Sequence, residues 1–304
     1  MPEATPLTKV LGVKSFGAEV ILHGANFDEA YDFAIKYSKE HNKVFIHPFS
    51  NKEVIAGQGT LALEILKELD DIDTIIVPIG GGGLITGIAT AIKALKPNIK
   101  IIGVVAQGAN AMKKSFDAKK IIKVKNIRTI ADGIAVKNVV PEMFDYINNL
   151  VDEIVEVSDK EIASAILFLL EKQKIMVEGA GATSLAAIMH DKVDIKNKKI
   201  VLPLSGGNID VSMLSLIIEK GLVKASRKMN LMITLIDKPG SLKLLTNIFE
   251  QNDANIGQID YDRDSVNLDF GDANITISLE TKGEEHQEQL RKELNKYGYI
   301  FKEL

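Results

Sequence analysis

The sequence has no cysteine, which excludes disulfide bonds, thiolate metal sites and a cysteine nucleophile. It also has no apolar run near the roughly 20 residues that a membrane-spanning helix needs. Residues 1–10 lack the apolar core and small-residue cleavage site of a secretion signal. The net charge of -4 leaves no basic patch for nucleic acid or for an anionic membrane. We therefore expect a cytoplasmic protein that binds neither nucleic acid nor membranes.

The order of elements in the first part of the chain predicts an α/β fold. Of its 304 residues, 46% are hydrophobic, enough to bury a core and to form more than one compact unit. From Ala18 to about Val124, short β-branched runs alternate with longer helical patterns, which is typical of βαβ units and a mainly parallel sheet. The expected strands are 19–22, 43–46, 74–79, 100–105, 153–157 and 199–204. The expected helices are 28–41, 57–69, 84–95, 162–170, 181–190 and 211–220, with a capping box at Ser158 and Glu161.

The character of the sequence changes at the polar, basic stretch 224–228. We place the domain boundary there, between a first unit of residues 1–222 and a second of residues 223–304. The second unit has the pattern of a βαββαβ module of about 75 residues. Its expected strands are 231–236, 255–261, 273–280 and 300–302, and its expected helices are 241–251 and 284–297.

The strongest local motif is Gly80-Gly81-Gly82-Gly83, between the strand 74–79 and a helix that starts near Leu84. Glycines let backbone amides approach an anion closely, and a helix N-terminus adds unpaired N–H groups and a positive dipole. The motif therefore predicts a phosphate site. It lacks the Lys-Ser/Thr pair of a Walker A loop and the third glycine of the dinucleotide fingerprint. A flexible strand-to-helix turn without a ligand is the less favoured alternative for this motif alone.

Two weaker motifs lie further along the chain. Ser205 follows the strand 199–204, at the edge where sites of α/β folds form, and is followed by Gly206-Gly207-Asn208. Glu178 is the only acid in a run of small residues before the helix 181–190. An ordinary turn and a solvated helix start explain these motifs equally well on their own.

Taken together, five motifs resemble those of the threonine ammonia-lyases, also called threonine dehydratases, which are fold-type II pyridoxal-phosphate enzymes related to serine racemase and serine dehydratase. The motifs are Ala-Gly-Gln-Gly-Thr at 56–60, Pro-Ile-Gly-Gly-Gly-Gly-Leu-Ile at 78–85, Ala-Asp-Gly at 131–133, Glu-Gly-Ala-Gly at 178–181 and Leu-Ser-Gly-Gly-Asn at 204–208. The resemblance covers residues 1–222 and implies a tryptophan-synthase-β-like α/β fold with parallel sheets, incomplete at the N-terminus.

The resemblance also implies a cofactor and a reaction. Pyridoxal 5'-phosphate would have its phosphate held by Gly80, Gly81, Gly82, Gly83 and the amide of Leu84. Ser205 would face the pyridine nitrogen, where a hydroxyl can hydrogen-bond without forcing protonation, and Glu178 would lie near the ring. L-threonine would lose its α-proton and β-hydroxyl and give 2-oxobutanoate and ammonia, and L-serine would give pyruvate.

The sequence departs from the family in two respects. The family's Schiff-base lysine lies in a Ser-Phe-Lys-x-Arg-Gly-Ala motif that these residues do not contain; residues 14–18 align with a helix-to-strand junction instead. Residues 1–6 resemble an internal stretch of complete enzymes, so we expect Met1 to be an internal methionine. No catalytic residue is therefore assigned, and we expect this chain alone to be inactive. Relatives that bind a divalent cation carry carboxylates where residues 105–111 have none, so no metal is expected.

The C-terminal module resembles an ACT domain, a ferredoxin-like regulatory fold. Its strand-to-helix turn and the start of its second strand imply an effector site, often for an amino acid, at Asp237, Pro239, Gly240, Asn255 and Ile256. Because ACT domains commonly pair, we expect a homo-oligomer. An ACT domain that only dimerises and binds no effector is the alternative.

The leading hypothesis is thus an effector-regulated threonine ammonia-lyase. A non-catalytic effector-binding or assembly subunit is the alternative from another class, and serine dehydratase or serine racemase activity is the alternative within the enzymes. The five histidines show no metal-ligand spacing and are interpreted as structural or surface residues: His23, His41, His47, His190 and His286.

Overall fold

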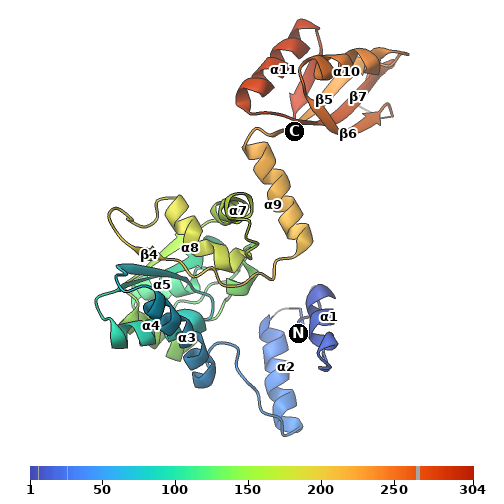
Figure 1. The fold of residues 1–304 in the computed structure, drawn as a ribbon. Coiled ribbons are helices and arrows are strands. Elements are labelled where there is room, and N and C mark those ends of the chain that lie inside the picture. Colours follow the sequence, from blue (N-terminus) through green and yellow to red (C-terminus); the bar gives the residue numbers. More distant parts are fainter. Residues whose placement is uncertain (6, 26, 265–267) are drawn as a thin grey trace.

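The computed structural model describes residues 1–5, 7–25, 27–264 and 268–304. Pro6, within the stretch compared above with an internal segment of complete enzymes, lies outside these ranges. Two bodies are visible in Figure 1: a larger α/β unit and a smaller C-terminal α/β module, joined by the helix α9 (Val211–Lys224). Helices α1 (Leu7–Ser15) and α2 (Phe27–Glu40) lie to one side of the larger unit.

The larger unit contains a sheet of four parallel strands in the order β3-β2-β1-β4. These strands are β1 (Thr74–Pro78), β2 (Lys100–Ala106), β3 (Glu153–Val157) and β4 (Ile200–Val201). Its other helices are α3 (Lys52–Glu68), α4 (Gly83–Leu95), α5 (Ala111–Ala118), α6 (Pro141–Leu150), α7 (Asp159–Phe168) and α8 (Gly179–Met189), with short 3-10 turns η1 (Gln107–Ala109) and η2 (Asp132–Ile134) and a π-helical turn η3 (Leu169–Gln173). The α/β fold with a parallel sheet is therefore confirmed.

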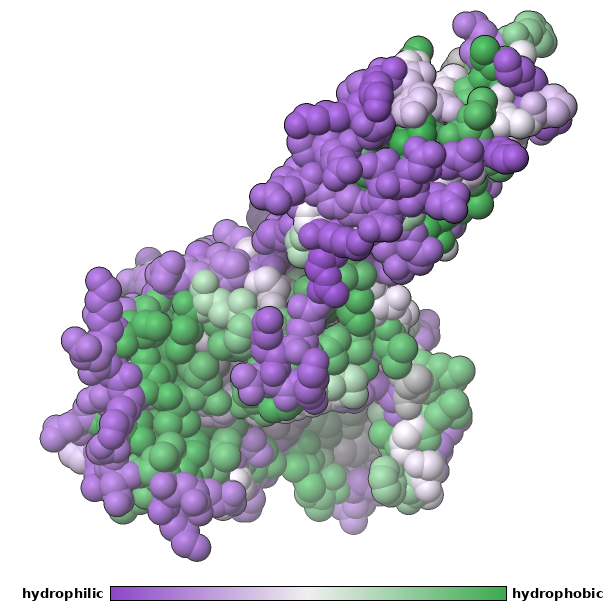
Figure 2. Space-filling model, turned by 45° about the horizontal axis from the view of Figure 1, so that its top comes forward, coloured by the Kyte–Doolittle hydropathy of each residue, from purple (hydrophilic) through white to green (hydrophobic). Residues whose placement is uncertain are grey.

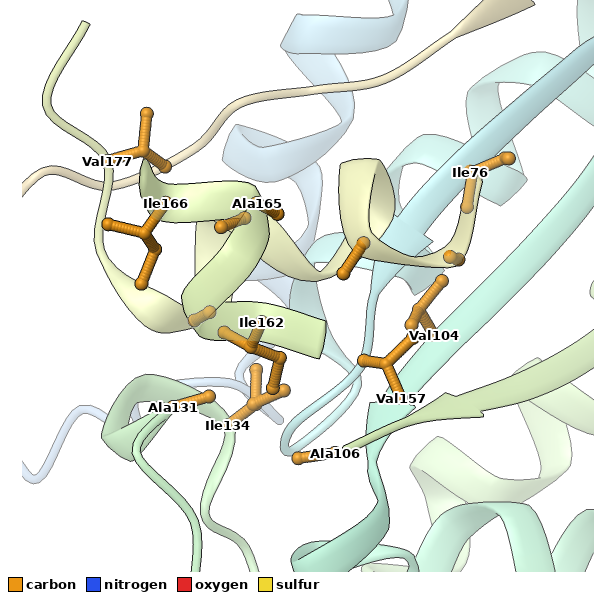
Figure 3. Packing of buried hydrophobic residues seen from close by; sticks show 14 of the residues in the cluster. Ile76, Val104, Ala106, Ala131, Ile134, Val157, Ile162, Ala165, Ile166 and Val177 are labelled. Atoms are coloured by element: carbon orange, nitrogen blue, oxygen red, sulfur yellow. The ribbon is translucent and has the colours of Figure 1, made fainter. Parts of the chain in front are cut away.

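Helices cover both faces of this sheet because its central strands are apolar on both faces, as buried parallel strands usually are. Ile75 and Val77 of β1 pack with helices α3, α4 and α6 on one face. Ile76, between them, points to the other face and packs with α7 and α8. Figure 3 shows this second cluster, in which α7 contributes the residues Ile162, Ala165 and Ile166.

Two expected strands are not formed. Residues 19–22 and 43–46 have no strand assignment, although their sequences are rich in β-formers. A strand needs a hydrogen-bonding neighbour, and no strand among the described residues pairs with either segment. Val44 is accordingly 90% exposed. The strand expected at 199–204 is limited to Ile200 and Val201, which pair with the first two residues of β1.

The C-terminal module has the βαββαβ order predicted from the sequence. Its four strands form an antiparallel sheet in the order β6-β7-β5-β8, separate from the parallel sheet. The module buries its own core, which includes Leu231, Ile233, Phe249, Ile275 and Leu290. Its elements are β5 (Lys228–Ile236), α10 (Ser241–Gln251), β6 (Asn255–Asp262), β7 (Asp272–Glu280), α11 (Glu284–Lys296) and β8 (Ile300–Glu303).

Helix α9 connects the two bodies and is packed against the larger one. It crosses α7 where a methyl group on Gly221 would overlap the side chain of Leu167. Beyond the helix, Arg227 makes an ion pair with Glu171 of the π-helical turn. The predicted boundary at 222/223 falls inside α9, which continues to Lys224.

The surfaces of the two bodies differ. The face of the C-terminal module seen in Figure 2 is mainly hydrophilic, whereas hydrophobic areas are visible on the body below it. Exposed apolar side chains occur in residues 7–46, among them Leu7, Phe16, Phe27 and Val44. In the described parts of the chain, no helix is both long and apolar enough to cross a membrane.

Candidate active site

A cavity of about 1100 Å³ opens at the carboxyl ends of the parallel strands. The strand order reverses between β1 and β4, because β2 and β3 continue on one side of β1 and β4 lies on the other. Ligands of open α/β sheets bind in the crevice at such a switch point. The loop after β1 contributes Gly80–Gly83 to the cavity, and the loop after β4 contributes Ser205. All seven residues predicted to bind the cofactor line it: Gly80, Gly81, Gly82, Gly83, Leu84, Glu178 and Ser205.

The glycine turn presents the N-terminus of α4 to this cavity. Gly82 is the N-cap residue, in the left-handed conformation (φ 98°), and no side chain caps the helix. The first bond of the helix runs from the Thr86 N–H to the Gly82 carbonyl at 2.9 Å. The amides of Gly83, Leu84 and Ile85 precede that bond, so they have no acceptor inside the helix. Together with the helix dipole, they can bind an anion such as a phosphate group.

The glycines are also required by the packing of the chain itself. A Cβ on Gly80 would lie 2.8 Å from Ile134 Cα, and one on Gly83 would lie 2.8 Å from the Phe49 carbonyl oxygen. A methyl group on Gly81 would overlap the ring of Phe49. Three of the glycines are therefore in close contact with other segments, and the packing favours glycine there whether or not the turn binds a ligand.

Glu178 is the N-cap residue of α8, and its carboxylate contacts the loop that carries Ser205. The Asn208 amide donates a hydrogen bond to Glu178 Oε2 at 3.1 Å, and the Glu178 amide donates one to the Gly206 carbonyl at 3.1 Å. Gly206 has a φ of 91°, and a Cβ there would lie 2.5 Å from Glu178 Oε1. The two weaker sequence motifs are thus one structural unit.

The electrostatics around Glu178 involve helix α1. Burial raises the pKa of Glu178 above its ordinary value; the Asn208 amide lowers it, the negative charge of Asp132 raises it and the positive charge of Lys9 lowers it. Lys9 reaches this region from α1 by an ion pair of 2.6 Å with Asp132. Half-buried Glu178 therefore accepts a proton more readily than an exposed glutamate does.

Several cavity residues were not singled out in the sequence. Tyr31, His47 and Phe49 form one wall, with ring centroids 5.4 Å apart for Tyr31 and His47 and 4.5 Å apart for His47 and Phe49. Two exposed lysines, Lys125 and Lys137, line another part. The sequence around Tyr31, His47 and Phe49 offered no signal for the cavity, because these residues meet only in the folded chain. The two lysines lie in a long irregular segment that offered no signal either.

The five residues predicted to bind an effector do not form one site within a single chain. Asp237, Pro239 and Gly240 follow β5, and Asp237 accepts hydrogen bonds from the Tyr261 hydroxyl (2.7 Å) and from Arg263 (3.4 Å). Asn255 opens β6 and pairs with Glu280, which in turn pairs with Lys228 at the start of β5. Asn255 and Ile256 therefore lie at the opposite end of the sheet, roughly 25 Å from the turn along the strand direction.

Comparison with known proteins identifies the family. Residues 1–206 match the family described as "Pyridoxal-phosphate dependent enzyme". The chain belongs to the pyridoxal-phosphate dependent enzymes. Its resemblance to the threonine ammonia-lyases is also confirmed, since the L-threonine ammonia-lyase of Geobacter sulfurreducens is 47% identical over 300 residues, covering 99% of this chain and 75% of that protein.

Solved structures support the same family assignment. The processed form of threonine deaminase isoform 2 from Solanum lycopersicum matches with a TM-score of 0.68 at 39% identity, over 72% of this chain and 61% of that one. Maize serine racemase matches with a TM-score of 0.66 at 36% identity, over 73% of this chain and 69% of that one. The chain thus spans less than two thirds of the tomato chain.

Pyridoxal phosphate is the cofactor of this family, and the cavity of this pyridoxal-phosphate dependent enzyme fits it. The amides of residues 83–85 form an anion-binding set beside a crevice large enough for a phosphorylated ring. The described residues contain no group of three or more histidine and carboxylate side chains that could hold a metal ion. The absence of a bound metal stays a prediction.

Proposed function

We propose that the cavity binds pyridoxal 5'-phosphate for the deamination of L-threonine to 2-oxobutanoate and ammonia, with L-serine as a second substrate that gives pyruvate. One observation carries the proposal: the five motifs that resemble the threonine ammonia-lyases lie in different segments of the chain, yet each contributes to the lining of one cavity. The contributing residues include Gln58, Gly82, Gly133, Glu178 and Ser205. The identity to L-threonine ammonia-lyase from Geobacter sulfurreducens supports the choice of substrate.

Some residues of the chain would bind the cofactor phosphate, and others would contact its ring and adjust its electronic properties. Gly80 to Leu84 would hold the phosphate through backbone amides, and Ser205 would hydrogen-bond the ring nitrogen. Glu178 would lie near the ring, in an environment that already disfavours its negative charge. When bound, the cofactor withdraws electrons from the substrate and makes its α-proton acidic.

We also propose that these 304 residues do not deaminate threonine by themselves, because no segment matches the Ser-Phe-Lys motif of the family. The amine of that lysine holds the cofactor and moves the α-proton. Lys125 and Lys137 line the cavity, but both lie in the segment between β2 and β3 rather than at the position of that motif.

The C-terminal module is proposed to be an ACT domain that forms a homo-oligomer and binds an amino-acid effector at the turn Asp237–Gly240. The support is its βαββαβ order and antiparallel sheet. Gly240, with a φ of 94°, caps α10 without a side-chain hydrogen bond.

The test compares pyridoxamine 5'-phosphate with pyridoxamine by isothermal titration of the purified chain. We expect the phosphorylated compound to bind roughly tenfold more tightly, because a helix N-terminus stabilises an anion. Equal affinities would contradict the phosphate site. In parallel, reduction with borohydride in the presence of pyridoxal phosphate should give no stoichiometric pyridoxyl-lysine; such an adduct with 2-oxobutanoate formation would overturn the inactivity proposal.

Two alternatives have specific support. The similarity to maize serine racemase favours serine chemistry at the same site, and turnover of threonine against serine, in a chain supplied with the lysine motif, separates the two. The C-terminal module, with its own antiparallel sheet, favours a non-catalytic effector-binding or assembly subunit. That alternative predicts that the chain supplied with the lysine motif binds an effector and turns over neither amino acid.

A further inference from the structure

The backbone that follows His47 fixes the tautomer of its neutral ring. Its Nδ1 atom accepts hydrogen bonds from the amides of Phe49 (3.3 Å) and Ser50 (3.1 Å). An imidazole nitrogen that accepts hydrogen bonds carries no proton, so the ring is neutral with its hydrogen on Nε2. The two bonds close a tight turn at residues 47–50, directly before α3.

This turn supports the glycine loop through Phe49. The ring of Phe49 stands edge-on to that of His47, with an interplanar angle of 86°, and lies over Gly81. The backbone of Phe49 also lies close to Gly83, since a Cβ on that glycine would be 3.0 Å from Phe49 Cα. Phe49 therefore contacts the loop on both sides of Gly82, the residue that caps α4.

We propose that neutral His47 is a positioning residue for the phosphate-binding turn, holding Phe49 against Gly81 and Gly83 so that the amides of residues 83–85 stay in place. The inference rests on the proposed cofactor site and adds a residue to it. Neither the glycine motif nor its resemblance to the family assigns a role to His47.

The proposal makes phosphate binding depend on the protonation of His47. A proton on Nδ1 removes the acceptor of both amides, so the turn and Phe49 lose their support. Burial lowers the pKa of His47 below its ordinary value of 6.5. The His47 ring contacts the rings of Tyr31 in α2, Phe45 and Phe49. Asp32, a charged residue, lines the same cavity. The support is therefore complete above about pH 6.5 and is lost as the pH falls through the lower pKa of the folded chain.

The experiment measures the affinity of the full chain for pyridoxamine 5'-phosphate between pH 5 and 8. His47→Ala should bind roughly tenfold more weakly at pH 7.5, because two hydrogen bonds are lost. His47→Asn should bind within about twofold of the wild type, because an asparagine oxygen accepts from the same two amides and does not titrate. The ratio of wild-type to His47→Asn affinity should then fall as the pH falls, since protonation of the ligand affects both proteins alike.

His41→Ala is the matched control, because His41 stacks on Tyr37 outside the cavity and should leave the affinity unchanged. Wild-type affinity in His47→Ala, or a pH-independent ratio, would overturn the positioning role alone. Failure of the wild type to bind would overturn the phosphate site and the role of His47 with it. If His47→Ala proves unfolded by circular dichroism, the pH profile of the wild type against His47→Asn still decides.

Discussion

At the level of single residues, the glycines of the turn serve two purposes because they have no side chain. They allow close packing against neighbouring segments, and they leave the backbone amides at the start of α4 accessible. Gly80, Gly81 and Gly83 admit neighbouring segments that a Cβ would displace, and Gly82 adopts a left-handed conformation that other residues avoid. The same absence of side chains exposes the amides at the start of α4. Glycine at these positions therefore stabilises the packing of the turn even before a ligand is considered.

Gly81→Ala tests this requirement. The added methyl group overlaps the Phe49 ring, so we expect a loss of about 1–3 kcal/mol in the free energy of unfolding and weaker binding of pyridoxamine 5'-phosphate. Gly57→Ala, in the interior of α3, is the matched control because no atom lies within 4 Å of its new Cβ. Urea denaturation should show the control stabilised by up to about 1 kcal/mol. Equal stability of the two variants would contradict the packing argument.

Glu178→Gln should stabilise the chain at neutral pH. The pKa of Glu178 is raised, chiefly by burial, so the folded state disfavours the ionised form and stability is lost as the pH rises through that pKa. Glutamine removes the charge and keeps an acceptor for the Asn208 amide. Because the side chain is partly solvated, we expect a rise in Tm of only about 1–2 °C at pH 7.5, shrinking toward pH 4. A variant with a lower Tm at pH 7.5 would speak against this interpretation.

The seven positions predicted to bind the cofactor lie in short sequence motifs, and all seven line the cavity. His47 was interpreted as a structural or surface residue, and the structure places it in the cavity wall. Its partners, the Phe49 and Ser50 amides and the Tyr31 ring, become neighbours only through the turn and the packing of α2. A single histidine carries no such information in its own sequence context.

At the level of elements, helix α3 supports α4 and hence the glycine turn. The two helices cross at a glycine contact, where a Cβ on Gly59 would lie 2.9 Å from the Gly87 carbonyl oxygen. Helix α3 starts at a side-chain cap, in which Asn51 Oδ1 accepts from the amides of Glu53 (2.9 Å) and Val54 (3.2 Å). The cap thus fixes the end of α3 that follows Phe49.

Asn51→Ala removes this cap. We expect the free energy of unfolding to fall by about 1 kcal/mol, as for other N-cap asparagines. Asn51→Asp keeps the acceptor and adds a negative charge at the positive end of the helix, so it should be as stable as the wild type. Thermal or urea denaturation measures both. If Asn51→Asp were destabilised, the hydrogen-bond acceptor at position 51 would not be what stabilises the N-terminus of α3.

Elements with local signals were predicted well. Strand β3, the capping box at Ser158 and Glu161, and helix α10 occur where the sequence placed them. Two expected strands were not formed: residues 19–22 and 43–46 have strand propensity, but no strand in the described part of the chain pairs with them. The expected strand 199–204 is reduced to the two residues of β4 that pair with β1. Strand formation is decided by pairing as much as by the strand's own residues.

At the level of the whole molecule, the C-terminal module has a sheet and a core cluster of its own. Its sheet shares no strand with the parallel sheet, and its core cluster is its own. We expect a fragment of residues 225–304 to fold cooperatively, although a module of this size is only marginally stable. Circular dichroism and dispersed amide signals in NMR would show this, and a disordered fragment would mean that α9 and the Arg227–Glu171 pair are needed for its fold.

The separation of Asp237 from Asn255 within the module has a consequence for assembly. A small molecule cannot reach both ends of one sheet, so a ligand that touches both groups must sit between two copies whose sheets run in opposite directions. Binding such a ligand would then be linked by mass action to self-association, and its apparent affinity would rise with the concentration of the protein.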